Sequence, residues 1–375
     1  MPLRSPRSGE SIGFHAYPAA SDEGTLGDPE TIIWSSIRHL CSGGVAEYVA
    51  ARVHGLKRAR DLRAVARNLK IYVLQSYEFY EAAKAAKPNT APLIYYYSFL
   101  NLAKAFCELR HPGFHERQEC YRHGVSWRPS PKYLVNLERE EVSLTTRGVW
   151  HVLWESLMRS ACTAPNPTRL RIKDLFLFCP EIGIEVDRAF GKDLQLLSLV
   201  APDVIYDKST REAWIRFSVN RIELKYYGLT APALIGTVAT PRSGYIEVRS
   251  TQAELRMFES ATPAKVGRGE TVLDAIYPDV TGMNVFCHLG RGNMIEYCIP
   301  LQRRFPLVLP QVMVLYTLLF WLGSLVRYDP HSVHELMESR YWSLLDGFMS
   351  QSRLWLLEQF EWALSQTETK LWVVR

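Results

Sequence analysis

The feature that most constrains this fold is a helical repeat of mostly apolar side chains between residues 62 and 83. Side chains of one face recur there every three or four residues, at Leu62, Val65, Leu69, Tyr72, Ser76, Phe79 and Ala83. This spacing is typical of a long amphipathic helix. Residues 87–89 end it, and residues 92–110 are apolar nearly all round, with Thr90 placed to cap a second helix. The two segments predict a helical hairpin whose second helix is buried.

Patterns elsewhere in the chain predict an α+β fold. Helical spacing indicates further helices at residues 31–40, 45–53, 148–161, 312–326, 333–348 and 352–365. Alternation of apolar and polar side chains predicts strands at residues 213–220, 244–249, 284–289 and 294–299, the last two joined by a turn at residues 290–293. We therefore expect a mainly helical bundle from the N- and C-terminal parts with a β-rich, mostly antiparallel central region.

The same patterns divide the chain into four stretches. The first thirty residues are polar and lack helical or strand periodicity, which is typical of a loosely held segment. We expect a flexible N-terminal tail (1–28), an N-terminal helical region (29–175), a β-rich middle region (176–305) and a C-terminal helical region (306–375).

Composition favours a globular protein of the cytoplasm. The seven cysteines are scattered and form no Cys-x-x-Cys pair, which predicts reduced thiols. The N-terminal residues lack the apolar segment of a secretory signal. The apolar stretch at residues 312–326 is shorter than the roughly 20 residues of a membrane span, so we expect a buried core helix and no membrane partner. The net charge is +5, and most of the 44 Lys and Arg residues are arginines, which suit contact with phosphate or carboxylate.

Three segments of the helical parts carry a family resemblance. Residues 92–105 contain an aromatic run that leads into a Ser-x-x-Asn-Leu-x-Lys-Ala pattern. His123-Gly124-Val125 follows after a short loop, and the C-terminal apolar stretch ends in Arg327-Tyr328. Together these segments resemble the YaaC-like family of bacterial proteins. The resemblance says little about the β-rich middle and implies no settled activity.

A partial resemblance also runs to the HEPN helical fold, in which an aromatic-rich second hairpin helix ends with a Lys-Ala step. Ribonucleases of that fold use an Arg and a His separated by four to six residues. Matching spacings occur at Arg110–His115, Arg117–His123 and Arg327–His334. About two or three such spacings are expected by chance, and prolines interrupt two of them. The resemblance implies RNA as substrate and His115, His123, Arg110 and Arg117 as catalytic candidates.

A polar stripe on the second hairpin helix gives a candidate binding site. Asn101, Lys104 and Glu108 share one face of a helix that should be buried. A buried lysine needs an anionic partner, which is either an internal carboxylate such as Glu108 or an anionic ligand in a pocket. In the second case Asn101 orients the ligand, and His123 is a candidate general acid or base. The further cationic candidates for ligand binding are Arg122, Arg128 and Arg327.

Two other motifs are weaker candidates for a functional site. Cys107, His111, His115, Cys120 and His123 are concentrated in one short segment, but they lack the Cys-x-x-Cys element of common zinc sites. We therefore predict neither a metal site nor a cofactor. Residues 267–269 and 290–292, both Gly-Arg-Gly, are better interpreted as β-turns than as phosphate loops, because neither links a strand to a helix.

Three hypotheses of function remain open. The first is a binding protein for nucleic acid, RNA or DNA, or for a nucleotide-like anion. The second is a HEPN-like ribonuclease effector in bacterial antiviral defence. The third is a non-catalytic subunit that binds a protein partner or forms a homo-oligomer. Salt-dependent nucleic-acid binding, RNA cleavage and the mass of the particle in solution discriminate among them.

Overall fold

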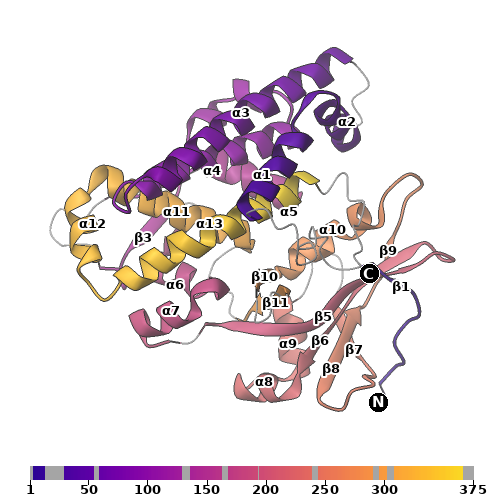
Figure 1. Cartoon of the computed structure of the whole chain (residues 1–375). Coiled ribbons are helices and arrows are strands. Elements are labelled where there is room, and N and C mark those ends of the chain that lie inside the picture. Colours follow the sequence, from indigo (N-terminus) through magenta and orange to yellow (C-terminus); the bar gives the residue numbers. More distant parts are fainter. Residues whose placement is uncertain are drawn as a thin grey trace, which may run out of the picture. The chain divides into compact units, whose positions relative to one another are not determined.

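The chain forms two compact units (Figure 1). The computed structural model describes residues 3–12, 29–54, 59–128, 136–162, 168–192, 194–238, 244–289, 295–301 and 308–365. We call residues 19–194 and 305–370 the helical unit, and residues 1–18, 195–304 and 371–375 the β-rich unit. The helical unit thus combines both helical parts of the chain, and the middle of the sequence forms the β-rich unit.

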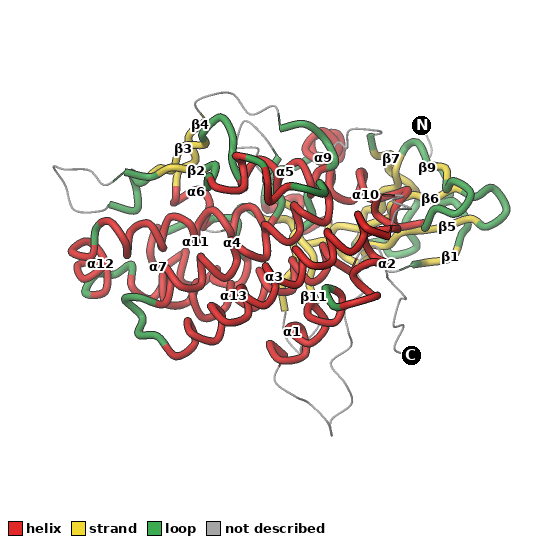
Figure 2. The backbone as a smooth tube through the Cα atoms, turned by 90° about the horizontal axis from the view of Figure 1, so that it is seen from above, coloured by secondary structure: helices red, strands yellow, loops and turns green. Residues whose placement is uncertain are grey.

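The helical unit is built from helices of unequal length and one small sheet (Figure 2). Its longer helices are α1 (Pro29–Leu40), α2 (Gly43–His54), α3 (Ala59–Ala85), α4 (Ala91–Arg110), α5 (Val149–Met158), α7 (Gly183–Phe190), α11 (Gln311–Tyr328), α12 (Pro330–Met337) and α13 (Trp342–Ser365). Shorter ones are α6 (Ile172–Phe176), η1 (Phe114–Glu116), η2 (Gln118–Tyr121) and η3 (Pro180–Ile182). The antiparallel strands β2 (Val125–Ser126), β3 (Glu141–Leu144) and β4 (Thr168–Arg171) form the small sheet.

Helices α3 and α4 form the predicted hairpin and lie side by side in both views (Figures 1 and 2). Two serines explain how polar residues fit between them. The Ser76 hydroxyl donates to the Ser98 carbonyl oxygen at 2.7 Å, and the Ser98 hydroxyl donates to the Ser76 carbonyl oxygen at 2.8 Å. Because both buried hydroxyls are satisfied, the small side chains allow the helices to pack closely. Thr90 precedes α4, but its hydroxyl donates to Lys87 instead of capping the helix.

Helix α11 is the predicted core helix. It is long and apolar enough to cross a membrane, yet 83% of that window is buried inside the fold. This burial favours a core helix over a membrane span. Gly323 sets how closely α11 approaches α4, because a Cβ at this position would lie 3.1 Å from the Tyr96 Cβ.

The β-rich unit contains an antiparallel sheet. Its main strands, in spatial order, are β10 (Phe286–Leu289), β11 (Ile295–Pro300), β5 (Leu196–Asp207), β6 (Glu212–Asn220), β8 (Leu255–Ser260) and β7 (Tyr245–Val248), with β1 (Glu10–Ser11) on β5 and β9 (Ala264–Lys265) on β6. Helices α8 (Arg221–Tyr226), α9 (Ala231–Val238) and α10 (Val272–Met283) belong to the same unit. Phe217, Phe258 and Ile276 are central to its core. All four predicted strands are confirmed; the turn at residues 290–293 lies outside the described residues.

The N-terminal segment departs from the expected flexible tail. Glu10 and Ser11 pair with β5, and the Arg7 guanidinium donates to two backbone carbonyl oxygens at the end of β8, those of Ser260 and Ala261, each at 2.9 Å. Gly9 permits this contact, because a Cβ there would lie 2.6 Å from Ile205 Cγ2. Periodicity could not predict the pairing, since its partners are about two hundred residues away in the chain. Residues 13–28 lie outside the described residues.

Two other expectations also change. The single helix predicted at residues 333–348 is wrong: α12 ends at Met337, and α13 then runs from Trp342 through Ser365. Ser339 explains the break, because its hydroxyl donates to the Leu336 carbonyl oxygen and accepts from the Tyr341 N–H. The stretch 176–190, which the pattern assigned to the β-rich middle, contains the end of α6, η3 and α7 and belongs to the helical unit.

Candidate functional site

A pocket of about 470 Å³ opens in the helical unit. Its walls come from the first half of α4, the last turns of α11 and the segment around strand β2. The side chains that define its chemistry are Tyr96, Tyr97, His123, Trp127, Arg128, Phe320, Ser324, Arg327 and Tyr328. No acidic side chain occurs among the described lining residues. The pocket therefore joins aromatic surface to two arginines and one histidine.

His123 is held in the pocket by two backbone hydrogen bonds between the loop at residues 122–124 and the start of α5, a contact that we call the backbone crossing. The Val149 N–H donates to the Arg122 carbonyl oxygen at 2.8 Å, and the Trp150 N–H donates to the His123 carbonyl oxygen at 3.0 Å. These bonds satisfy the first N–H groups of α5, which have no partner inside the helix. The loop carrying His123 is thereby fixed at the start of α5.

The crossing requires glycine on both sides. Gly124 has φ +83° and Gly148 has φ +147°, values that side chains rarely permit. A Cβ on Gly148 would lie 2.3 Å from the Gly124 backbone nitrogen. This close approach explains why glycine follows His123 in the His123-Gly124-Val125 segment. A side chain at position 124 or 148 would separate the two backbones and displace the histidine.

Tyr96 orients the imidazole ring. Its hydroxyl lies 2.6 Å from His123 Nδ1, and the Phe320 ring contacts both side chains, with ring centroids 5.4 and 5.7 Å away. Burial raises the pKa of Tyr96, so the phenol stays protonated and can donate to Nδ1. This assignment places the imidazole proton on Nε2. Nε2 has no hydrogen-bond partner within the part of the chain that the structure describes.

The surroundings of His123 favour its neutral form. Burial lowers its pKa, and the positive charges of Lys104 and Arg327 lower it further. A neutral imidazole can donate from Nε2 without adding positive charge to the pocket. The charge available to an anionic ligand there resides on the arginines.

Arg327 lies at the pocket edge. Its Nη1 donates to the Tyr97 hydroxyl at 3.1 Å, and its guanidinium carbon lies 5.1 Å from the Tyr328 ring centroid. Both Arg327 and Arg128 are exposed. Trp127 is mostly buried, and its indole N–H donates to Glu140 Oε2 at 2.7 Å. Because that donor is already used, Trp127 offers the pocket its aromatic surface.

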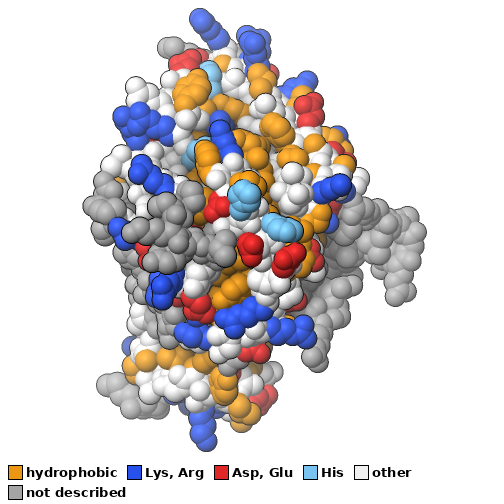
Figure 3. All heavy atoms as spheres, turned by 90° about the vertical axis from the view of Figure 1, so that its left-hand side faces the viewer, with side chains coloured by type: hydrophobic (Ala, Val, Ile, Leu, Met, Phe, Trp, Pro, Cys, Tyr) orange, Lys and Arg blue, Asp and Glu red, His pale blue; other side chains and the backbone are white. Residues whose placement is uncertain are grey.

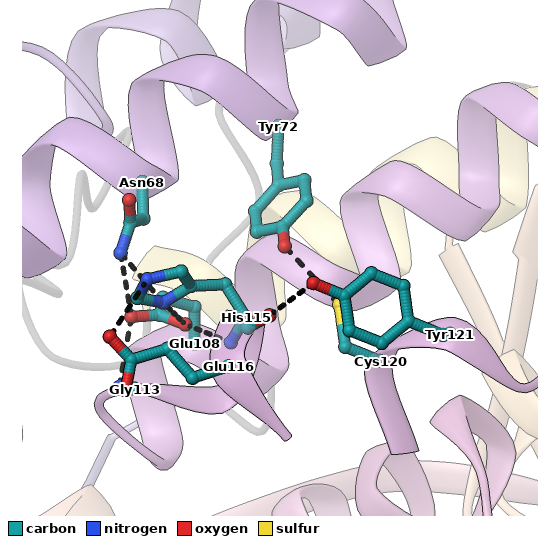
Figure 4. A network of polar contacts seen from close by, with 8 residues as sticks. All are labelled: Asn68, Tyr72, Glu108, Gly113, His115, Glu116, Cys120 and Tyr121. Carbon is teal, nitrogen blue, oxygen red and sulfur yellow. Dashed lines mark hydrogen bonds and ion pairs between the residues drawn. The ribbon is translucent and has the colours of Figure 1, made fainter. Parts of the chain in front are cut away.

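Lys104 does not pair with Glu108, one of the alternatives for its anionic partner. Glu108 is buried, and its carboxylate accepts from the Gly113 N–H at 3.0 Å, the His115 N–H at 2.9 Å and the Asn68 amide at 3.1 Å (Figure 4). These N–H donors satisfy the carboxylate without a cation. Lys104 is half-buried and forms no ion pair with any described residue. It is not among the described lining residues of the pocket, although its charge acts on His123.

The same network holds His115 (Figure 4). Its Nδ1 lies 3.0 Å from the Asn68 amide nitrogen and 3.3 Å from Glu108 Oε2. The side chain is 37% exposed, with Nε2 3.5 Å from Glu116. Tyr121 donates to the His115 carbonyl oxygen at 3.2 Å. Glu108 thus fixes the turn after α4, and this turn fixes the histidine.

The remaining sequence candidates lie apart from the pocket lining. Arg110 ends α4, with its guanidinium carbon 5.5 Å from the Phe106 ring centroid. Arg117 is an exposed residue between η1 and η2, and Arg122 contributes its carbonyl oxygen to α5 while its side chain is exposed. Asn101 is 7% exposed and lies on α4 one turn before Lys104. Of the nine candidates, the pocket therefore brings together His123, Arg128 and Arg327.

Among the described residues, no group of three or more His, Cys, Asp or Glu side chains is arranged to hold a metal ion. Cys107 is fully buried, and Cys120 Sγ lies 3.3 Å from the Tyr72 hydroxyl (Figure 4). The Gly-Arg-Gly segment at residues 267–269 forms the predicted turn, with Gly269 at φ +82°. The second such segment, at residues 290–292, lies outside the described residues.

Sequence reasoning missed the aromatic wall. Tyr96 belongs to the quoted aromatic run, but Trp127 and Phe320 were not singled out. Trp127 follows the His-Gly step by only three residues, so its position was available as a signal. Phe320 is almost two hundred residues away and looked like an ordinary core residue, so only folding reveals its contact with His123.

The fold and the pocket define an α+β protein whose helical unit carries an aromatic, arginine-flanked site. A family model described as YaaC-like Protein matches residues 46–361, and the chain belongs to this family. The match includes the hairpin, the His123 loop, the β-rich middle and most of α13. Comparisons with curated proteins and with solved structures found no match.

Proposed function

We propose that the helical unit binds a nucleotide-like anion in the His123 pocket. The observation that best supports this proposal is that one pocket contains aromatic surface, two arginines and no acidic side chain among its described lining residues. A volume of about 470 Å³ suits a small organic ligand. Aromatic rings stack on planar bases, and guanidinium groups form bidentate contacts with phosphate.

Different residues of the pocket contact different parts of the proposed ligand. Tyr328 is 56% exposed and offers a ring for base stacking at the pocket edge. Arg327, beside it, is placed to meet the phosphate. His123 Nε2 supplies a neutral donor for a carbonyl or phosphate oxygen. On the molecular face in Figure 3, Lys and Arg side chains are interspersed with acidic and hydrophobic ones, and they form no continuous basic surface in that view.

Titration calorimetry with the four ribonucleoside monophosphates tests this proposal. Arg327→Gln should weaken binding about tenfold or more, because a hydrogen bond to a charged group contributes about 1.5–3 kcal/mol. Arg188→Gln is the matched control, since Arg188 is an exposed arginine on α7 of the same unit. Tyr328→Ala should also weaken binding. Absence of binding at millimolar ligand, or equal affinity in Arg327→Gln and the wild type, contradicts the proposal.

A second candidate is RNA cleavage by a HEPN-like ribonuclease. It is supported by the His115 ring, which is fixed through Nδ1 while its side chain is 37% exposed. Such a histidine is suited to general acid–base catalysis. In this case purified protein cleaves RNA, and His115→Ala or His123→Ala abolishes cleavage. Unchanged cleavage in both variants rules this candidate out.

A further inference from the structure

We infer that the ligand of this site is a single-stranded nucleic acid, with one nucleotide in the His123 pocket and a neighbouring phosphate against Lys104. This inference rests on the proposed function and adds a second anion-binding position to it. The position is defined by Lys104 and Asn101, which lie one turn apart on α4.

Lys104 is a half-buried cation without a counter-ion among the described residues. Its nearest carboxylate on the helix, Glu108, is already satisfied by N–H donors from α3 and from the turn after α4. A partly buried charge is costly unless an opposite charge compensates it. An anionic ligand supplies this compensation without a change in the surrounding protein.

Asn101 adds an independent observation at the same position. Its side chain is 7% exposed, and its amide forms no hydrogen bond with the described part of the chain. Neither amide atom is fully enclosed, so the amide is reachable by a ligand from solvent. The amide can donate to a phosphate oxygen that contacts Lys104, so a ligand would satisfy both groups together.

The spacing argues for two phosphates. Arg327 bonds to Tyr97, and Lys104 follows Tyr97 by seven residues, about 10 Å along the helix axis. This separation of the backbone positions favours one phosphate at Arg327 and a second at Lys104. Asn101 and Lys104 follow Tyr97 by four and seven residues and lie on the same face of α4, so they extend the side of the pocket where Tyr97 bonds to Arg327. A strand that continues beyond the first nucleotide can bring its next phosphate to Lys104 and Asn101.

The test compares uridine monophosphate, uridine triphosphate and the dinucleotide pUpU, with thymidine counterparts, by calorimetry. We expect the dinucleotide to bind about tenfold tighter than the monophosphate, in either the ribose or the deoxyribose series. Lys104→Gln should remove this gain and leave the monophosphate affinity within about twofold. Lys70→Gln, at an exposed lysine on α3, is the matched control and should preserve the gain.

The wild-type protein gives a second readout that does not depend on any variant. For each ligand, the logarithm of the association constant is plotted against the logarithm of the salt concentration. The slope for the dinucleotide should be steeper than the slope for the monophosphate by about 0.7, the value for one additional phosphate contact. Equal affinities and slopes for the two ligands overturn the inference while leaving the proposed function intact. An equal gain for the triphosphate also overturns it, because the second anion then need not belong to a strand. Failure of every ligand to bind refutes both proposals.

Discussion

Substitution of Gly148 by alanine tests whether the backbone crossing positions His123. The added Cβ would lie 2.3 Å from the Gly124 nitrogen, 2.5 Å from the Gly124 Cα and 2.7 Å from the Arg122 carbonyl oxygen. All three atoms belong to the backbone, so no side chain can move aside. The loop at residues 122–124 must separate from the start of α5 and carry His123 away from Tyr96.

The cost follows from the bonds that this separation breaks. The crossing contains the Val149 N–H to Arg122 bond and the Trp150 N–H to His123 bond. Each contributes about 0.5–1.5 kcal/mol, and a side chain in this backbone region, which essentially only glycine adopts, adds about 1–3 kcal/mol. We expect Gly148→Ala to lower the free energy of unfolding by about 2–6 kcal/mol.

Gly113→Ala is the matched control. Gly113 also has a positive φ, +81°, but a Cβ there meets nothing within 4 Å. It should therefore cost about 1–2 kcal/mol, the backbone term alone. Urea unfolding, followed by circular dichroism and tryptophan fluorescence, measures both variants. Nucleotide affinity should fall only in Gly148→Ala. A difference of less than about 1 kcal/mol between the variants refutes the proposed role of the crossing.

Three further changes test other parts of the structure. Burial raises the pKa of Glu181 to about 8, so the protonated carboxyl group stabilises the folded state and this stabilisation is lost as pH rises toward 8. Glu181→Gln should therefore reduce the fall in the midpoint of thermal unfolding between pH 5 and 8. Parallel plots of this midpoint against pH for the variant and the wild type contradict this. Thr317→Val leaves the buried Trp150 indole N–H without its acceptor, 2.9 Å away, and should cost about 1–3 kcal/mol in urea unfolding; a neutral effect means that the bond contributes little. Gly9→Ala places a Cβ 2.6 Å from Ile205 Cγ2, which should weaken the contact of the N-terminal segment with β5. Proteolysis of this segment should increase, whereas nucleotide affinity should not change. Unchanged proteolysis indicates that the segment tolerates the added side chain.

Local periodicity predicted the elements that carry a strong repeat. The hairpin, the core helix α11 and four strands follow from spacings of three to four or of two residues, because these spacings decide which side chains share a face. Prediction failed where a single polar group decides the outcome. Ser339 ends α12 through its own hydrogen bonds, and no periodic signal marks that position.

The candidate site shows the same division. Patterns in the sequence predicted the α+β class and the hairpin and singled out His123, Arg128 and Arg327 as candidates. Folding was needed to show that Glu108 bonds to Asn68 and the turn after α4, which leaves Lys104 without a described counter-ion. It also brought Phe320 to His123. Helical spacing is set by covalent geometry over a few residues, whereas the partner of a buried charge or ring depends on which distant segments pack beside it.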